Sequence, residues 1–228
     1  MTNDKKTLRV WDPVVRIGHW TLVIAFFTAY FTEDDFMDLH VWAGYVVTAY
    51  LLIRILWGFV GGKYARFSNF IYSPSQIIGC LKNLITRKPQ HYIGHNPAGG
   101  AMVVALLLSL AATTLTGLKL YAVEDNKGPF AVSATQAQTH IQSTSLISVA
   151  NAADDEDDDE KSERNGNERR IDKEGEEFWE ELHEVFANLT LLLVFLHILG
   201  VAVSSYIDKE KLVKVMLTGK KDVDDTYQ

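Results

Sequence analysis

Four long apolar segments constrain this 228-residue chain more than any other feature. They run near residues 14–31, 39–60, 99–121 and 178–206, and the charged residues lie almost wholly between them. The mean hydropathy is close to zero only because this segregation is averaged out. Each segment has 18 or more residues, and about 20 residues of α-helix cross the hydrocarbon core of a bilayer. The sequence therefore predicts an all-α protein, a transmembrane four-helix bundle embedded in lipid.

The basic residues predict which side of the membrane each connection occupies. Residues 1–16, the connection 61–98 and the C-terminal tail carry Lys and Arg, whereas residues 32–38 carry none and contain four acidic residues. Because Lys and Arg concentrate in cytoplasmic loops, we expect both termini and residues 61–98 in the cytoplasm. Residues 74–85 within that connection have the spacing of a short interfacial amphipathic helix. We expect a multi-pass protein of the bacterial inner membrane, with no nucleic-acid partner.

The third connection, residues 122–177, holds 6 Lys or Arg against 15 Asp or Glu. Its second half is an acidic, low-complexity run that cannot bury enough apolar surface to order itself. We therefore expect a single membrane domain over 1–228 with a long acidic periplasmic loop, partly disordered, between the third and fourth helices. The loop has two interpretations: a docking segment for a partner with a basic face, such as a c-type cytochrome, or a solvated spacer.

The histidines of the spans carry the chemical information. His19 lies on the cytoplasmic side of the first span, and His40 lies at the periplasmic start of the second. His183 and His197 lie 14 residues apart on the fourth span, about 21 Å along one face of a helix. Depth in the membrane then pairs His19 with His197 toward the cytoplasm and His40 with His183 toward the periplasm.

Each pair can supply two axial imidazoles to a haem iron between helices. The only cysteine is Cys80, and no Cys-x-x-Cys-His motif is present, so a covalent c-type haem is excluded. A zinc site is a poor alternative because it needs about four converging ligands. A proton-coupled transporter would also explain buried histidines, but four spans without Pro-broken helices fit it poorly.

Two arginines lie near the proposed cytoplasmic site. Arg54 is 14 residues after His40 on the second span, and Arg16 is one turn before His19. A charged side chain inside a span usually marks a function or a buried partner. A haem propionate is one partner, and a lipid phosphate reached by snorkelling is the other.

The remaining histidines, His91, His95 and His140, fall in connections and are expected at the surface. A second interpretation places His91 and His95 at a quinone headgroup.

At this point the sequence resembles a known family, the bacterial cytochrome b561 and nickel-hydrogenase b-type cytochromes. The resemblance is carried by short motifs in all four spans: VWDPVVRIGHW at 10–20, LHVWAG at 39–44, RILWG at 54–58, GHNPAG at 94–99, and ELH at 181–183 followed by His197. It implies two haem b groups with bis-histidine ligation by the four span histidines. It also implies electron exchange between the quinone pool and a redox partner. The long acidic loop departs from compact members of the family.

The resemblance leads to one leading function and two alternatives. We expect an electron-transfer oxidoreductase subunit that passes electrons across the membrane between quinone and a periplasmic c-type cytochrome or hydrogenase-like complex. The first alternative is a stand-alone superoxide:quinone oxidoreductase, which the acidic periplasmic side opposes because superoxide is an anion. The second is a membrane anchor or transporter without haem.

Overall fold

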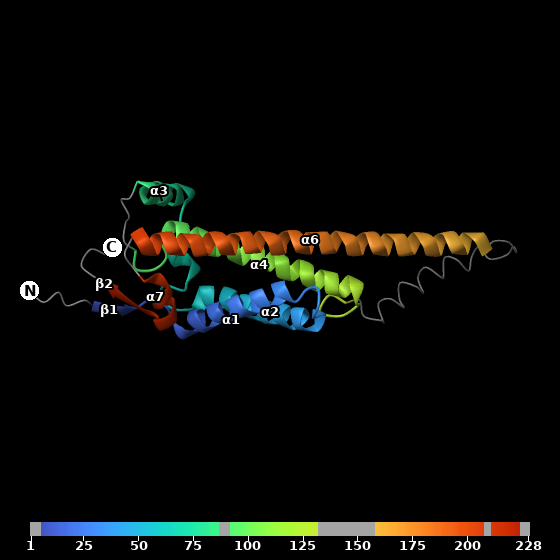
Figure 1. Ribbon diagram of the computed structural model, residues 1–228, viewed down its shortest axis with the longest axis horizontal. Helices are drawn as coiled ribbons and strands as arrows, with labels where there is room; N and C mark the ends of the chain where they lie inside the picture. Colours follow the sequence, from blue (N-terminus) through green and yellow to red (C-terminus); the bar gives the residue numbers. More distant parts are fainter. Residues whose placement is uncertain (1–5, 87–91, 132–157, 208–210, 224–228) are drawn as a thin grey trace, which may run out of the picture. The chain divides into compact units, whose positions relative to one another are not determined.

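A computed structural model describes residues 6–86, 92–131, 158–207 and 211–223, without the side chains of residues 84, 85, 158–172, 222 and 223. Figure 1 shows its elements along the chain. In order they are β1 (Lys6–Arg9), α1 (Pro13–Phe31), α2 (Met37–Val60), the 3-10 helix η1 (Phe67–Asn69), α3 (Pro74–Ile85), α4 (Pro97–Glu124), α6 (Asp158–Ile207), α7 (Leu212–Thr218) and β2 (Lys220–Val223).

Within the described residues, four helical stretches are long and apolar enough to cross a membrane. They are Pro13–Phe31, Met37–Val60, Pro97–Glu124 and Lys173–Ile207, which contain the four predicted spans. Large apolar side chains on these helices, such as Trp42 and Phe195, are exposed on the isolated chain. Lipid tails are as apolar as these side chains, so such exposure is expected of a protein solvated by a bilayer. The predicted fold class, an all-α membrane protein with four spans, is confirmed.

Local sequence signals explain where two of the spans begin. The Asp12 carboxylate accepts a hydrogen bond from Val15 N at 3.0 Å, and Pro13 is the first residue of α1. The Asn96 side chain accepts from Gly99 N at 2.7 Å, and Pro97 opens α4. In both cases an N-cap side chain is followed by proline. The side chain accepts from an amide group that the first helical turn leaves without a partner, and proline has no such amide hydrogen.

The fourth spanning helix is longer than the sequence predicts. α6 begins at Asp158, whereas the acidic loop was expected to continue to residue 177. Glu, Lys and Arg have high helix propensity. They extend a helix readily once the adjoining apolar segment of the same chain has formed its first turns. The part of the predicted loop over 132–157 lies outside the described residues.

A two-stranded antiparallel ribbon joins the two ends of the described chain. β1 pairs with β2 in the register Lys6 with Val223 and Arg9 with Lys220, and the strands lie side by side in Figure 1. Gly219 permits this return, because it adopts a φ of 75° at the end of α7 and its carbonyl accepts from Val10 N at 2.9 Å. The sequence pattern does not predict this ribbon.

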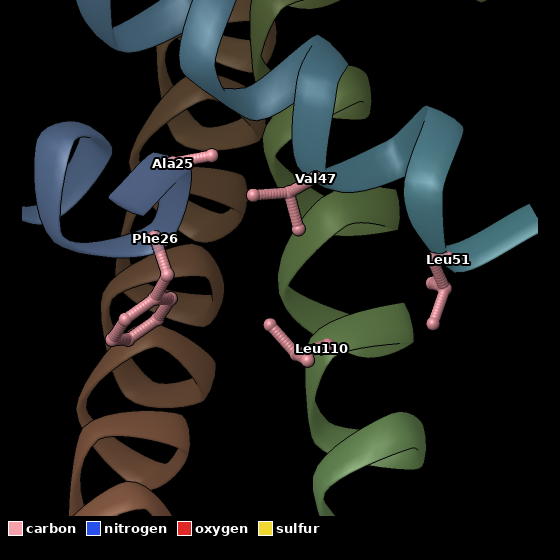
Figure 2. Close-up of a cluster of buried hydrophobic side chains, with 5 residues drawn as sticks. All are labelled: Ala25, Phe26, Val47, Leu51 and Leu110. Atoms are coloured by element: carbon pink, nitrogen blue, oxygen red, sulfur yellow. The ribbon is translucent and has the colours of Figure 1, made fainter. Parts of the chain in front are cut away.

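The described chain divides into two compact units, one over 1–111 with 186–228 and one over 112–185. The core of the first unit consists of Ala25, Phe26, Val47, Leu51 and Leu110. Figure 2 shows these side chains, which come from α1, α2 and α4. In the same unit the Ser109 and Thr190 hydroxyls lie 2.6 Å apart and join α4 to α6. Such a bond between hydroxyls is typical of helix packing in membranes.

Candidate haem-binding site

The first unit brings His19 of α1 and His197 of α6 together. Their ring centroids lie 6.5 Å apart, and the ring planes are inclined by 58°. With a metal–nitrogen bond of about 2 Å, two imidazoles on opposite sides of one metal have centroids about 6 Å apart. The separation therefore suits two axial ligands of one iron. The two residues are 178 positions apart, so only the packing of α1 with α6 can produce this pair.

The His19 ring nitrogen Nδ1 is buried and has no hydrogen-bond partner among the described residues. Trp20 packs its edge against the His19 ring, with centroids 5.3 Å apart. A buried polar nitrogen without a partner is costly in a native structure and calls for an explanation.

His40 and His183 have different surroundings from this pair. His40 Nδ1 lies 2.9 Å from the carbonyl oxygen of Ala29. His183 Nδ1 lies 3.0 Å from the carbonyl oxygen of Thr113 and 3.2 Å from the Thr116 hydroxyl. A carbonyl oxygen only accepts, so Nδ1 is the donor in both of these hydrogen bonds. Histidines that bind metals usually have this arrangement, in which the second nitrogen donates to a carbonyl.

His40 belongs to the first compact unit and His183 to the second, and each unit is described by itself. The pairing of these two histidines stays a prediction from their depth in the sequence.

Arg54 is buried to 6% relative exposure in the middle of the first unit. Its guanidinium lies over the rings of Phe67 at 5.3 Å and Phe70 at 5.7 Å, which are cation–π contacts. Its Nη1 has no hydrogen-bond partner among the described residues. The N–H groups of Nη1 therefore lie inside the protein, where they could donate to a buried acceptor.

Arg16 and Asp12 also lie at this end of α1. Arg16 donates from Nη2 to the carbonyl of Leu217, and its Nε is buried without a partner in the described chain. The Asp12 carboxylate accepts from the Trp57 indole at 3.0 Å and interacts electrostatically with Arg54.

His95 corrects the sequence analysis, which expected a surface residue. Its ring packs on Trp11 at 4.6 Å and Phe70 at 4.9 Å between centroids, and its Nδ1 is buried without a partner in the described chain. Burial, with smaller contributions from Arg54 and His197, lowers the pKa of His95 to about 4. The imidazole is therefore neutral at physiological pH. His91 and His140 lie outside the described residues.

The glycines of the spans provide space in two ways. A Cβ at Gly117 would stand 2.7 Å from Cε1 of His183, and one at Gly18 would overlap the Tyr50 ring, so these glycines permit close packing. A Cβ at Gly44 or Gly200 would meet nothing within 4 Å. Gly44 is one turn from His40 and Gly200 is one turn from His197, so both proposed ligands have open space beside them.

The described residues contain no group of three or more His, Cys, Asp or Glu that could hold a metal ion. A bis-histidine haem needs only two protein ligands, because the macrocycle supplies the other four.

The profile of the family described as prokaryotic cytochrome b561 matches residues 10–219. The chain belongs to this family. Membership in a family of b-type cytochromes implies haem b and electron transfer in the membrane. The match covers all four candidate spans and stops just short of both strands of the ribbon.

Among curated proteins, the relatives are named as probable Ni/Fe-hydrogenase B-type cytochrome subunits. The one from Bradyrhizobium diazoefficiens is 29% identical over 147 residues, which cover 51% of this chain and 59% of that protein. The Ni/Fe-hydrogenase 1 subunit from Escherichia coli (strain K12) is 28% identical and covers 54% of this chain and 63% of that protein. This chain thus spans about three fifths of the length of these relatives. No solved structure gives a significant match.

Proposed function

We propose that this chain binds a haem b between α1 and α6, with His19 and His197 as the two axial ligands. The observation that carries the proposal is the 6.5 Å separation of the two ring centroids. Filled axial positions leave no site for oxygen chemistry, so the haem supplies one-electron transfer through its edge.

His40 and His183 hold a second haem b nearer the other face of the membrane. The depth argument from the sequence supports their pairing. The hydrogen bonds from Nδ1 to the Ala29 and Thr113 carbonyls support the role of each residue, because they hold the tautomer that a metal ligand needs.

Arg54 and Arg16 receive the propionates of the haem held by His19 and His197. The nitrogen atoms of both guanidinium groups that lack partners in the described chain support this assignment. An Arg–carboxylate pair is strong when it is bidentate and shielded from water. Neutralisation by a propionate would also offset the cost of burying Arg54.

The two sites form an electron relay between the quinone pool and a redox partner on the periplasmic side. The printed names of the relatives support a hydrogenase-like complex as that partner, and a c-type cytochrome is the other candidate. The distribution of Lys and Arg supports an inner-membrane orientation with both termini in the cytoplasm.

The haem content of purified variants tests this proposal. We expect about two haem b per chain from the pyridine haemochrome spectrum, and about one after substitution of any of the four histidines by leucine. Thr48→Val is the control, because its hydroxyl only donates to the carbonyl of Gly44, at 2.8 Å, and it should keep both haems. A His19→Leu or His197→Leu protein that retains full haem content would contradict the α1–α6 site.

A further inference from the structure

The connection between α2 and α4, residues 61–98, carries five Lys or Arg and no Asp or Glu. Lys63, Arg66 and Lys82 are exposed among its described residues, and no carboxylate on this connection can neutralise them. Because α2 ends and α4 begins here, the connection lies where two consecutive spans meet the same membrane surface. Basic segments next to spanning helices attract anionic lipid headgroups.

The chain around α3 is fixed at the level where α4 enters the membrane. The Tyr72 hydroxyl, two residues before α3, donates to the carbonyl of His95, two residues before α4, at 3.1 Å. A Cβ at Gly100, in the first turn of α4, would overlap the carbonyl oxygen of Phe70, so the two segments pack closely. In Figure 1 α3 accordingly lies at the end of α4 where that helix starts. α3 therefore begins at the surface of the bilayer.

One side of α3 is apolar and uncovered. Ile78 and Leu81 lie three residues apart, on the same side of the helix, and are 52% and 45% exposed. Lys82, which is also exposed, borders this side, about 40° around the helix from Ile78. Asn83 lies on the other side, about 140° from Ile78. A helix with an exposed apolar side and a basic residue beside it is suited to lie in the headgroup layer.

We infer that α3 binds anionic phospholipid at this surface, with Ile78 and Leu81 among the acyl chains and Lys82 against a lipid phosphate. The occupant is a lipid because the uncovered apolar side and the unneutralised charges lie where two spans enter the bilayer, next to the headgroups. Lys63 and Arg66 add to the attraction from the same connection. The inference rests on the four spans and does not depend on haem ligation.

Quenching by doxyl-labelled lipids tests this inference on the full-length protein. Cys80 is the only cysteine, so Cys80→Ser combined with Ile78→Cys or Asn83→Cys gives a single site for a bimane fluorophore. The proteins are reconstituted in nanodiscs of phosphatidylcholine with the same small fraction of doxyl-phosphatidylglycerol or doxyl-phosphatidylcholine. For Ile78→Cys we expect stronger quenching by doxyl-phosphatidylglycerol. For Asn83→Cys we expect weak quenching by both lipids.

Removal of the Lys82 charge should weaken the preference for the anionic lipid. One basic side chain at a membrane surface favours anionic lipid by about fivefold, so Lys82→Gln should lower the ratio of the two quenching constants by about that factor. Lys82→Arg should keep the ratio. Lys119→Gln is the control, because Lys119 lies near the other end of α4, and it should leave the ratio unchanged. High salt should lower the ratio in the unsubstituted background.

Equal quenching of the Ile78→Cys probe by the two lipids would overturn the inference, and so would an unchanged ratio in Lys82→Gln. A probe that neither lipid nor aqueous acrylamide quenches would show that protein, such as a second copy of the chain, covers the apolar side. Quenching by acrylamide alone would place α3 in water. Each variant should unfold near the wild-type midpoint. If Ile78→Cys does not fold, the same measurement with Leu81→Cys decides the matter.

Discussion

At the scale of single residues, the surroundings of each histidine matter more than its presence in a span. Counting along the sequence places the four span histidines at two depths. It does not reveal that His183 is held by a carbonyl 70 residues earlier, or that His40 is held by one 11 residues earlier. These bonds depend on how helices pack, which spacing along the sequence does not show.

Gly117→Ala should remove the haem held by His183. The new Cβ would stand 2.7 Å from Cε1 and 3.1 Å from Nδ1 of that ring, so the ring must move away from the Thr113 carbonyl. We expect the haem content to fall from about two to about one per chain. Gly175→Ala is the control, since a Cβ there meets nothing within 4 Å. Full haem content in Gly117→Ala would show that the His183 ring does not need its observed position.

His95 makes stability depend on pH. Its folded pKa of about 4 lies below the ordinary 6.5, so between these values the unfolded chain binds a proton that the folded chain excludes. The stability is therefore complete above pH 6.5 and declines toward pH 4, by up to about 3 kcal/mol. Thermal unfolding of wild type and His95→Gln at about pH 7.5 and about pH 5 measures this effect. We expect a smaller decline in the variant, and equal declines would refute it.

At the scale of elements, the starts of α1 and α4 can be predicted from the sequence, whereas the pairing of β1 with β2 cannot. Asp12-Pro13 and Asn96-Pro97 are local signals, and α1 and α4 begin where those signals predict. The ribbon of β1 and β2 joins strands more than 200 residues apart in mostly polar sequence, with no alternation of apolar residues to indicate it. The early start of α6 was also missed, because its acidic composition resembles that of a loop.

Asp12→Ala should destabilise the start of α1. The carboxylate caps Val15 N and also accepts from the Trp57 indole, so alanine leaves two donors without their partner. We expect a loss of about 1–3 kcal/mol, read as a lower unfolding midpoint in detergent. Asp12→Asn should recover most of this loss because an amide oxygen also caps. The exposed Asp34 provides a control, and Asp34→Ala should have little effect. An unchanged unfolding midpoint in Asp12→Ala would show that the Asp12 cap does not stabilise α1.

At the scale of the whole molecule, the four spans and their order could be predicted because bilayer thickness dictates helix length. The His19/His197 pair could also be predicted, since depth limits which histidines can meet. The buried His95 could not be predicted, because a ring between Trp11 and Phe70 requires the connection 61–98 to fold back on the N-terminus. Family membership supports the proposed haem chemistry, and the packing of α1 with α6 supports its proposed location.

Electron transfer across a sealed membrane tests the central claim most directly. Vesicles containing the purified protein and trapped ferricyanide would receive dithionite on the outside, with potassium and valinomycin to balance charge. We predict rapid reduction of the trapped ferricyanide by wild type and by Thr48→Val, and a rate close to that of empty vesicles for His197→Leu. Wild-type transfer at the rate of empty vesicles, or undiminished transfer by His197→Leu, would contradict a relay through the α1–α6 site.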